Sequence, residues 1–474
     1  MSSETVHLLV LVHGMWGNPS HLNSLRKEIK ERYSQPDCPR GPGGEQLEVL
    51  LAETNQDEHT YDGVDWGGER VAEEILAAVK RLEDTGKRVT RFSITGYSLG
   101  GLISRYAVGV LHQRGFFETV IAINFNTIAT PHIGLPRYRT FLSSVSSFLG
   151  PTLLSRTGEQ FWAVDKWSPR GRPLLEVMAD PDRVFYQALC KFQHLRIYAN
   201  AVHDQTVPYP TAAIEADDVF YEHMTNGIEI ELDEQYAPLI KSYHLPDTPP
   251  PPPIVPKPLT REWFTNVRLP LPPALQFRFP YNILIFVTLP VLMPLFLTLV
   301  LTRLTLSMRA SRKRLRLLEK EETSVDRLMH IIARLERNME DTMADMLDGP
   351  ASPGTPPAED APYKAATSPP RAVLATPDGE SSALENGESS AKAGRVDAVT
   401  VSHPSGRPPT VLMTDLQLRL VRMLNTLPHL QKELAFIHPV ANAHGPIICR
   451  DPKRFPSHKL GEGVVRHWAD HFIV

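Results

Sequence analysis

The sequence has little cysteine and almost no net charge for its length. Its 474 residues include three cysteines, and the charged side chains leave a net charge of only −4. The three thiols, Cys38, Cys190 and Cys449, are too few and too scattered for a disulfide framework or a cysteine-based zinc site. We therefore expect a reducing compartment. The small net charge gives no reason to expect a nucleic-acid partner.

The amino-terminal segment lacks the basic residues that open a secretory signal. No Lys or Arg precedes the apolar run Val6–Val12, which leads directly into His13-Gly14. A secretory signal has a basic start, an apolar stretch and a cleavage site with small residues. We interpret Val6–Val12 instead as a buried β-strand that ends in a functional loop.

Strand-like and helix-like patterns alternate over the first 130 residues. Apolar runs such as Val6–Val12 and Val89–Thr95 alternate with segments of helical spacing such as Gly68–Leu82 and Leu99–Gln113. This order predicts an α/β fold, with a mostly parallel sheet and helices on both of its faces.

Residues 1–247 are expected to form the core of this fold. Periodicity weakens in 133–183, which is rich in Ser, Phe, Trp and Leu. We predict a lid or cap there, over the carboxyl edge of the sheet, where α/β folds place their pockets. The alternative is a helical subdomain that only packs against the core.

The composition changes repeatedly after residue 247. The unbroken run Pro249–Pro253 must be extended, and dense Pro, Ser and Gly with few large apolar residues predict disorder. The expected segments are a proline-rich linker (248–278), a hydrophobic membrane segment (279–302), a basic amphipathic helix (303–347), a disordered insertion (348–410) and an ordered carboxyl-terminal part of the core (411–474).

The strongest catalytic signal is Gly96-Tyr97-Ser98-Leu99-Gly100. It fits the pattern G-x-S-x-G between an apolar strand and a helix, which is the setting of a nucleophile elbow. The sharp turn needs small neighbours, and it places the serine at a helix N-terminus, which stabilises a developing negative charge. We predict Ser98 as a nucleophile. The alternative is a structural glycine-rich turn.

A serine nucleophile also needs backbone N–H donors for the oxyanion. One predicted donor is the N–H of Leu99, directly after the nucleophile. The other is the N–H of Met15, in the loop His13–Gly17 that follows the first strand. His13 is expected to hold this loop in shape. The residues predicted to bind substrate are Trp16, Tyr97 and His132.

The remaining members of a triad should follow in the order acid, then histidine, each after a strand. Asp204 follows the strand Leu195–Val202 and is the predicted acid, with Asp217 and Asp218 as alternatives. His444 follows the strand-like Leu434–Ile437 and is the predicted base. The histidines ranked below it are His438, His458 and His467. His203 and His132 are expected to be structural or to line the pocket, and the chemistry needs no metal or other cofactor.

Together these motifs resemble the family of putative serine esterases, within the α/β-hydrolases. The matching segments are His13–Gly17, Gly96–Gly101, Thr130–Gly134, Asp204–Pro208, and His444 with Ile447–Asp451. The resemblance covers Val6 to about His244 and Leu434 to about Asp451. Within that family, the motifs are similar to those of the fungal lipid-droplet phospholipases, which act broadly on glycerophospholipids. The resemblance implies an α/β-hydrolase with Ser98, Asp204 and His444 as its triad.

The segment Phe279–Thr302 holds no charged residue over 24 positions. As a helix it would be about 36 Å long, enough to cross a bilayer. A single crossing, however, would put the predicted base on the other side of the membrane from the nucleophile. The segment must therefore enter and leave on the same face of the membrane or lie along its surface. We expect a hairpin that turns near Pro290 and Pro294 and suits a droplet monolayer. The alternative is burial between the hydrolase and the helix that follows.

The sequence as a whole predicts a serine hydrolase of glycerolipid or phospholipid esters. We expect it on the cytosolic face of a membrane, at the lipid droplet or the endoplasmic reticulum, with basic side chains after the hydrophobic segment among anionic headgroups. One alternative is a thioesterase that removes acyl groups from proteins or coenzyme A. Another is a non-catalytic membrane tether that keeps the hydrolase fold.

Overall fold

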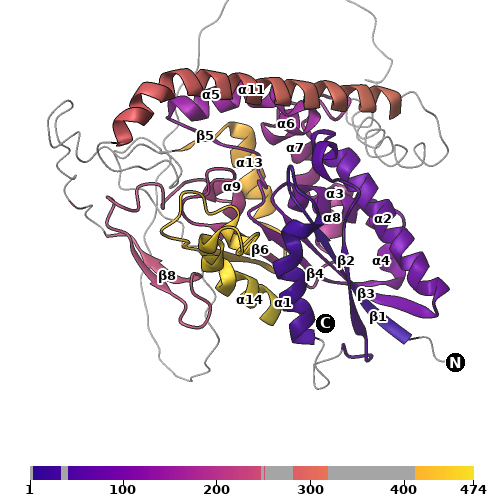
Figure 1. Cartoon of the computed structure of the whole chain (residues 1–474). Helices are drawn as coiled ribbons and strands as arrows, with labels where there is room; N and C mark the ends of the chain where they lie inside the picture. The colour runs from indigo at the N-terminus through magenta and orange to yellow at the C-terminus, as the bar shows by residue number, and fades with distance from the viewer. Residues whose placement is uncertain (1–3, 34–40, 247–249, 251–280, 319–410) are drawn as a thin grey trace, which may run out of the picture. The chain divides into compact units, whose positions relative to one another are not determined.

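A six-stranded parallel sheet forms the centre of the described chain (Figure 1). The computed structural model describes residues 4–33, 41–246, 250, 281–318 and 411–474. The strand order is β10-β6-β4-β3-β1-β2, and each neighbouring pair is parallel. The strands are β1 (Glu4–Val12), β2 (Gln46–Leu51), β3 (Lys87–Tyr97), β4 (Ile121–Ile128), β6 (His194–Asn200) and β10 (Leu430–Ala435).

Helices cover both faces of this sheet. The first layer contains α2 (Val64–Asp84), α3 (Leu99–Gln113), α8 (Val184–Leu189) and α13 (Asp415–Leu424), and the second contains α1 (Asn23–Tyr33) and α14 (Glu462–Asp470). Side chains of β1 alternate between the two layers: Val10 faces the first, and its neighbours Leu9 and Leu11 face the second. The predicted α/β-hydrolase architecture is thereby confirmed.

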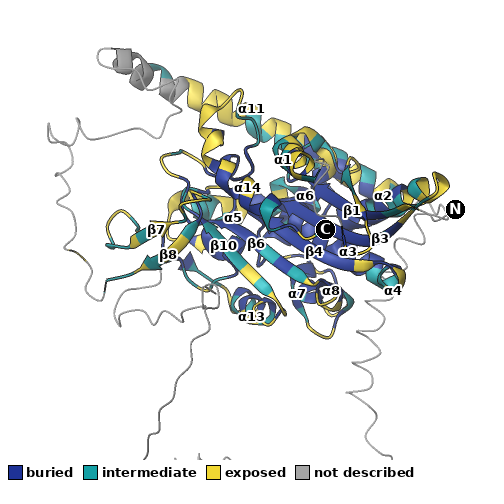
Figure 2. Ribbon diagram, turned by 90° about the horizontal axis from the view of Figure 1, so that it is seen from below, coloured by how far each residue is buried: buried dark blue, intermediate teal, exposed yellow. Residues whose placement is uncertain are grey.

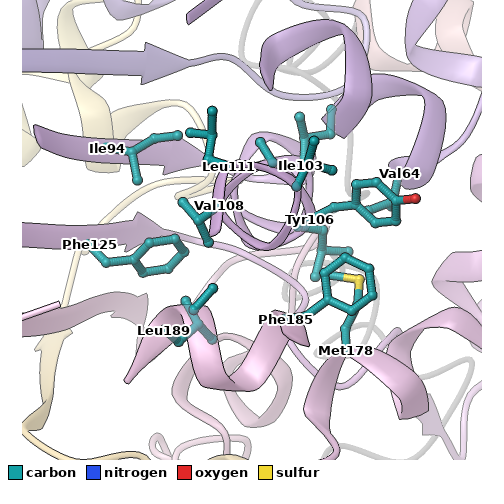
Figure 3. Packing of buried hydrophobic residues seen from close by; sticks show 14 of the residues in the cluster. Val64, Ile94, Ile103, Tyr106, Val108, Leu111, Phe125, Met178, Phe185 and Leu189 are labelled. Atoms are coloured by element: carbon teal, nitrogen blue, oxygen red, sulfur yellow. The ribbon is translucent and has the colours of Figure 1, made fainter. Parts of the chain in front are cut away.

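The helix that follows the elbow, α3, is buried along almost its whole length. Its apolar side chains point in every direction (Figure 3), with Val108 and Leu111 near the strand residues Ile94 and Phe125. On the side away from the sheet, the ring of Tyr106 lies 4.8 Å from that of Phe185. A helix enclosed in this way gives the elbow a rigid base.

The predicted lid segment 133–183 is largely helical. It contains the short strand β5 (Arg137–Tyr138) and the helices α5 (Phe141–Leu153), α6 (Ser155–Phe161) and α7 (Leu174–Ala179). Thr157 and Gln160 of α6 bond to the backbone N–H groups of Gly63 and Val64, so α6 is tied to the start of α2. Its function as a lid remains a prediction.

The hydrophobic segment is one continuous helix and not the hairpin that we expected. The helix α11 (Tyr281–Leu318) has 38 residues, about 57 Å, and runs through Pro290 and Pro294 without a turn (Figure 1). Each proline removes only one hydrogen bond of the helical ladder, and the bonds around it continue the helix. The expected basic helix begins as the second half of α11.

The two halves of α11 differ in burial, as Figure 2 shows. The helix contacts α5, α6 and the 3₁₀ helix η2 (Asp57–Tyr61), and its second half bonds to α6 and η2. Ser311 of α11 is fully buried and donates to Asp62 Oδ1 at 2.7 Å, and Arg314 donates to the same oxygen at 3.0 Å. The first half has exposed side chains from Leu292 to Leu299.

The chain enters the described core again at Val411. There β9 (Val411–Leu412) pairs antiparallel with β5. The remaining elements are α4 (Phe116–Thr119), α9 (Tyr209–Ala213), the antiparallel pair β7 (Glu229–Leu232) and β8 (Ile240–His244), and the 3₁₀ helices η1 (Pro19–Leu22), η4 (Pro446–Ile448) and η5 (Pro456–Gly461). Three predictions fall on residues that the structure does not describe. They are the linker (248–278, apart from Pro250), the part of the basic helix beyond Leu318 and the disordered insertion (348–410).

Candidate active site

Three polar side chains from distant parts of the chain meet at the carboxyl edge of the sheet. His444 Nε2 lies 3.0 Å from Ser98 Oγ, and His444 Nδ1 lies 2.9 Å from Asp204 Oδ2. Ser98 follows β3, Asp204 follows β6 and His444 follows β10, and parallel strands end at one edge. The structure thus brings together the three residues predicted as nucleophile, acid and base, with the imidazole between the hydroxyl and the carboxylate.

The backbone at Ser98 is strained, as a nucleophile elbow requires. Ser98 has φ 55° and ψ −126°, outside the regions that L-residues prefer. The turn is possible because Gly96 and Gly100, two positions before and after Ser98, have no side chain. A Cβ on Gly100 would lie 2.2 Å from the carbonyl oxygen of Val12, and one on Gly96 would lie 2.5 Å from the oxygen of Gly100. The Ser98 N–H is bonded to the Ile128 carbonyl at 2.9 Å.

Both oxygens of the Asp204 carboxylate are held by hydrogen bonds. Oδ1 accepts from the N–H groups of Thr206 and Val207, at 3.0 and 2.8 Å. Oδ2 accepts from Asn200 Nδ2 at 2.8 Å as well as facing the imidazole. The carboxylate orientation is therefore set before substrate arrives. Asn200 was not foreseen from the sequence, because a buried Asn inside a strand carries no motif.

Tyr97 lies under the imidazole and not in a substrate pocket. Its hydroxyl donates to the backbone carbonyl of His444 at 2.8 Å, and its ring lies 5.0 Å from the imidazole. Burial raises the pKa of the Tyr97 phenol, so the hydroxyl remains a donor. The substrate-binding prediction for Tyr97 is thus replaced by a position beneath the base.

The loop after β1 lies directly against the nucleophile. A Cβ on Gly14 would be 2.7 Å from the Cβ of Ser98 and 3.2 Å from its Oγ. Met15 is the next residue of this loop, and Leu99 is the first residue of α3. In the described loops and turns, neither amide donates to a backbone carbonyl. Both remain the predicted oxyanion donors.

The side chains near this loop have separate positions. Burial lowers the pKa of His13, whose Nδ1 lies 3.1 Å from the Gly14 carbonyl, which agrees with its expected structural position. Trp16 is 53% exposed, and its indole N–H donates to the hydroxyl of Tyr61 at 2.8 Å. Trp16 is thus the accessible aromatic residue of the loop, and its contact with substrate stays a prediction.

His132 is placed in the core, and its ring and backbone are both bonded to protein groups. It is 3% exposed, and its Nε2 lies 2.8 Å from Thr127 Oγ1. Its backbone carbonyl accepts from the buried guanidinium of Arg105 at 3.0 Å. Burial lowers the pKa of His132 well below its ordinary value. This geometry agrees with a structural position for His132, and its contact with substrate stays a prediction.

The alternative acids and bases have other partners. Asp218 is buried and accepts from the Tyr138 hydroxyl at 2.6 Å. The lower-ranked histidines bond elsewhere: His438 to His203, His458 to the Asp451 amide and His467 to the Tyr198 hydroxyl.

Comparison with known proteins agrees with this geometry. Residues 2–216 match the family described as "Putative serine esterase", which confirms over that part of the chain the resemblance expected from the motifs. A "Putative lipase" of Schizosaccharomyces pombe is 30% identical over 248 residues, covering 49% of this chain and 30% of that protein. "Putative lipase ROG1" of Saccharomyces cerevisiae is 31% identical over 215 residues, covering 44% and 28%. The matched part thus spans about 30% of these relatives' lengths.

Solved structures give more distant similarities. A putative cell surface hydrolase from Lactobacillus plantarum is 16% identical, covers 44% of this chain and 74% of its own, and has a TM-score of 0.25. The phospholipase PlaB from Legionella pneumophila, in complex with thio-NAD, is 13% identical, covers 42% and 39%, and has a TM-score of 0.27. The family match therefore supports a lipase-like serine esterase, while the choice of ester is left open.

Proposed function

We propose that this chain hydrolyses glycerolipid or phospholipid esters through a covalent acyl-enzyme at Ser98. The observation that carries the proposal is the imidazole of His444, which lies within hydrogen-bond distance of both the Ser98 hydroxyl and the Asp204 carboxylate. A hydroxyl becomes an effective nucleophile when an adjacent base takes its proton and a third group orients that base. The three residues fit those three roles.

The reaction has two halves. Ser98 Oγ attacks the acyl carbonyl while His444 Nε2 takes the hydroxyl proton, and the Met15 and Leu99 amides stabilise the oxyanion. His444 then protonates the leaving alcohol, and the acyl group stays on Ser98. In the second half, water attacks the acyl-enzyme with His444 as base, and the fatty acid leaves. Asp204 stabilises the imidazolium in both halves.

A labelling experiment with a matched serine control tests this chemistry. The full chain should react with a fluorophosphonate probe and release fatty acid from phosphatidylcholine or triacylglycerol. Ser98→Ala should lose labelling and several orders of magnitude in rate, whereas Ser242→Ala, which removes an exposed serine on β8, should lose neither. Equal labelling of both variants would contradict the proposal. Faster cleavage of acyl thioesters than of these lipids would reassign the substrate.

We further propose that the first half of α11 and the helix α5 contact a lipid surface. Every residue from Leu292 to Leu299 is exposed, so this stretch is apolar on all sides without a covering of described protein. On α5, which contacts α11, Phe141 and Phe148 are each 81% exposed. A helix that is apolar all round belongs in a core or in lipid. Large exposed apolar patches on a protein surface mark interaction sites.

The course of the chain favours a helix that lies along the surface. The second half of α11 is anchored on the hydrolase, and residues before 247 belong to the same fold. If the first half crossed a membrane, residues 251–280 would have to cross back, yet they include charged residues such as Lys257, Arg261 and Arg268. An in-plane helix avoids this, and it serves a droplet monolayer and a bilayer equally.

Basic side chains extend this surface along the second half of α11. Arg303, Arg309, Arg312, Lys313 and Arg316 are all exposed. Each cation near an anionic membrane contributes about 1 kcal/mol of binding free energy. These cations support binding to an anionic membrane surface, and we propose the cytosolic face of the endoplasmic reticulum or of lipid droplets as the protein's location.

Flotation with vesicles tests the surface. Phe141→Asp combined with Phe148→Asp should weaken binding to phosphatidylcholine–phosphatidylserine vesicles at least tenfold, because each charge would enter the acyl region. Ile121→Asp is the matched control, since Ile121 is exposed but begins β4 at the opposite edge of the sheet. Unchanged flotation of the α5 variant would contradict the surface. Hydrolysis of a short soluble ester should be similar in all three proteins.

A further inference from the structure

Three histidines outside the triad lie together beside the loops that carry the acid and the base. They are His203, His223 and His438, and one ring nitrogen from each lies within 4.8 Å of the others. They come from three segments: the residues after β6, the loop between α9 and β7, and the residues after β10. The proposed reaction gives none of the three a part.

The ring of His223 is oriented as a metal ligand would be. Its Nδ1 lies 3.0 Å from the carbonyl of Phe220, so this nitrogen carries the proton and donates, and Nε2 presents a lone pair. That Nε2 atom is buried and has no hydrogen-bond partner. Histidines that bind metals usually donate their other N–H to a backbone carbonyl or a carboxylate, which fixes the tautomer. An unpartnered buried nitrogen otherwise costs free energy.

The other two rings already share one proton. His203 Nε2 lies 2.9 Å from His438 Nδ1, and the two rings stack at 5.1 Å. A cation between them would use the lone pairs of both nitrogens, and the shared proton would move through solvent to the other nitrogen of the ring that carries it. In a tetrahedral site with Zn–N bonds of about 2.0–2.1 Å, the nitrogens lie about 3.4 Å apart. His438 is exposed and can move to widen this gap and to let the third nitrogen close in.

From this cluster we propose a zinc site formed by His203, His223 and His438. Three neutral imidazoles without a carboxylate in the cluster suit Zn²⁺ and are poor ligands for Ca²⁺ or Mg²⁺, which prefer oxygen. The exposed side of His438 leaves the fourth position to water. The sequence did not indicate this site, because its ligands are 20 and 215 residues apart and share no motif.

The ion would act as a clamp on the triad loops and not as a catalyst. His203 directly precedes Asp204, and its carbonyl accepts from the amide of Ala443, the residue before His444, at 2.9 Å. A zinc ion on His203 and His438 would therefore join the loop of the acid to the loop of the base. Bound to His223 as well, it would fix the segment between α9 and β7 to both.

Zinc titration of the full chain tests the site. After dialysis against EDTA, calorimetry with ZnCl₂ should show one equivalent bound per chain, and zinc should raise the melting temperature. His438→Gln and His223→Gln should each weaken binding by at least about tenfold and abolish the zinc-dependent rise in melting temperature. His438 is exposed, so His438→Gln should melt like the wild type in EDTA.

His244→Gln is the matched control. His244 is an exposed histidine at the end of β8 and is not one of the three ligands. It should bind zinc as the wild type does. Absence of stoichiometric binding in the wild type would overturn the proposal. So would equal affinity in His438→Gln, His223→Gln and the wild type, because the ion would then be held elsewhere, for example at the triad.

Discussion

Tyr97 positions the base without touching the reacting atoms. Its hydroxyl donates to the His444 carbonyl, and its ring supports the imidazole. Removing one such hydrogen bond costs about 1 kcal/mol. We predict that Tyr97→Phe lowers kcat several-fold and leaves KM for a short ester unchanged, because the imidazole loses alignment while the substrate site stays intact.

The matched control for this change is Tyr33→Phe. Tyr33 also donates from its hydroxyl to a backbone carbonyl, that of Phe472, but this bond joins the end of α1 to the segment after α14. Steady-state kinetics and melting temperatures of both variants separate the effects. Equal losses of stability with unchanged kcat in both variants would give Tyr97 a purely structural part.

Glu69 makes stability depend on pH. It is 2% exposed, and burial, followed by the charge of Asp65, raises its carboxyl pKa from 4.5 to about 9. Between these two values the folded chain keeps a proton that the unfolded chain releases, so the free energy of unfolding falls as pH rises. We predict that Glu69→Gln raises the melting temperature at pH 8, with a gain that shrinks towards pH 5.

Thermal unfolding from pH 5 to pH 9 measures this effect. The Tyr106 hydroxyl, which donates to Glu69 Oε1 at 3.2 Å, can still donate to the amide oxygen of the glutamine. Glu83→Gln, an exposed change on the same helix, should leave the pH profile as it is. A gain for Glu69→Gln of equal size at all pH values would show that charge is not the cause.

Among single residues, the sequence predicts those that a catalytic motif identifies. Ser98 stands in G-x-S-x-G, Asp204 and His444 follow strands, and the structure brings all three together. Tyr97 and His132 lie inside motifs as well, in Gly96–Gly101 and Thr130–Gly134. Their burial, however, depends on side chains far away in the sequence. Proximity in a motif therefore predicts a place near the site and not the direction in which a side chain points.

Among the elements, α11 depends on one buried carboxylate for its docking. Asp62 is fully buried and accepts from Ser311, Arg314 and Arg70, the last at 2.7 Å. We predict that Arg314→Ala loosens the second half of α11, because Asp62 and Glu58 both lose a partner. Limited trypsin digestion should then cleave faster at Arg309, Arg312 and Lys313.

Arg316→Ala is the control for this experiment. Arg316 is exposed on the same helix, so its loss should not change cleavage at the remaining basic residues. Mass spectrometry of the early fragments identifies the cleaved bonds. Identical digestion of the two variants would mean that the remaining contacts, including those of Ser311 and Leu315, hold the helix.

Regular elements were predictable where one periodicity dominates. The strand β1 and the helix α3 agree closely with the apolar run Val6–Val12 and the predicted Leu99–Gln113. The hairpin was wrong because two prolines in a long apolar run weaken a helix without ending it. The last strand was misplaced by several residues: β10 is Leu430–Ala435, an edge strand whose polar residues hide its pattern.

At the scale of the whole molecule, the sheet is completed by a strand from the carboxyl-terminal part of the chain. β10 pairs along its length with β6, and the loop after it brings His444 to Ser98, 346 positions away in the sequence. The order of nucleophile, acid and base predicted this closure, because a hydrolase needs its histidine after the last strand. The surface that α11 and α5 form together could not be predicted from the sequence, because it depends on tertiary packing.

Because β10 stands near the end of the sequence, the chain can be cut into two polypeptides that each carry part of the site. A protease site engineered near residue 360 and then cut would leave nucleophile and base on separate polypeptides, held by the pairing of β10 with β6 and of β9 with β5. We predict that the nicked protein keeps its esterase activity until it is denatured. On renaturation, recovery should become second order in protein, so that tenfold dilution slows the return of activity tenfold, whereas the uncut chain refolds at a rate independent of dilution.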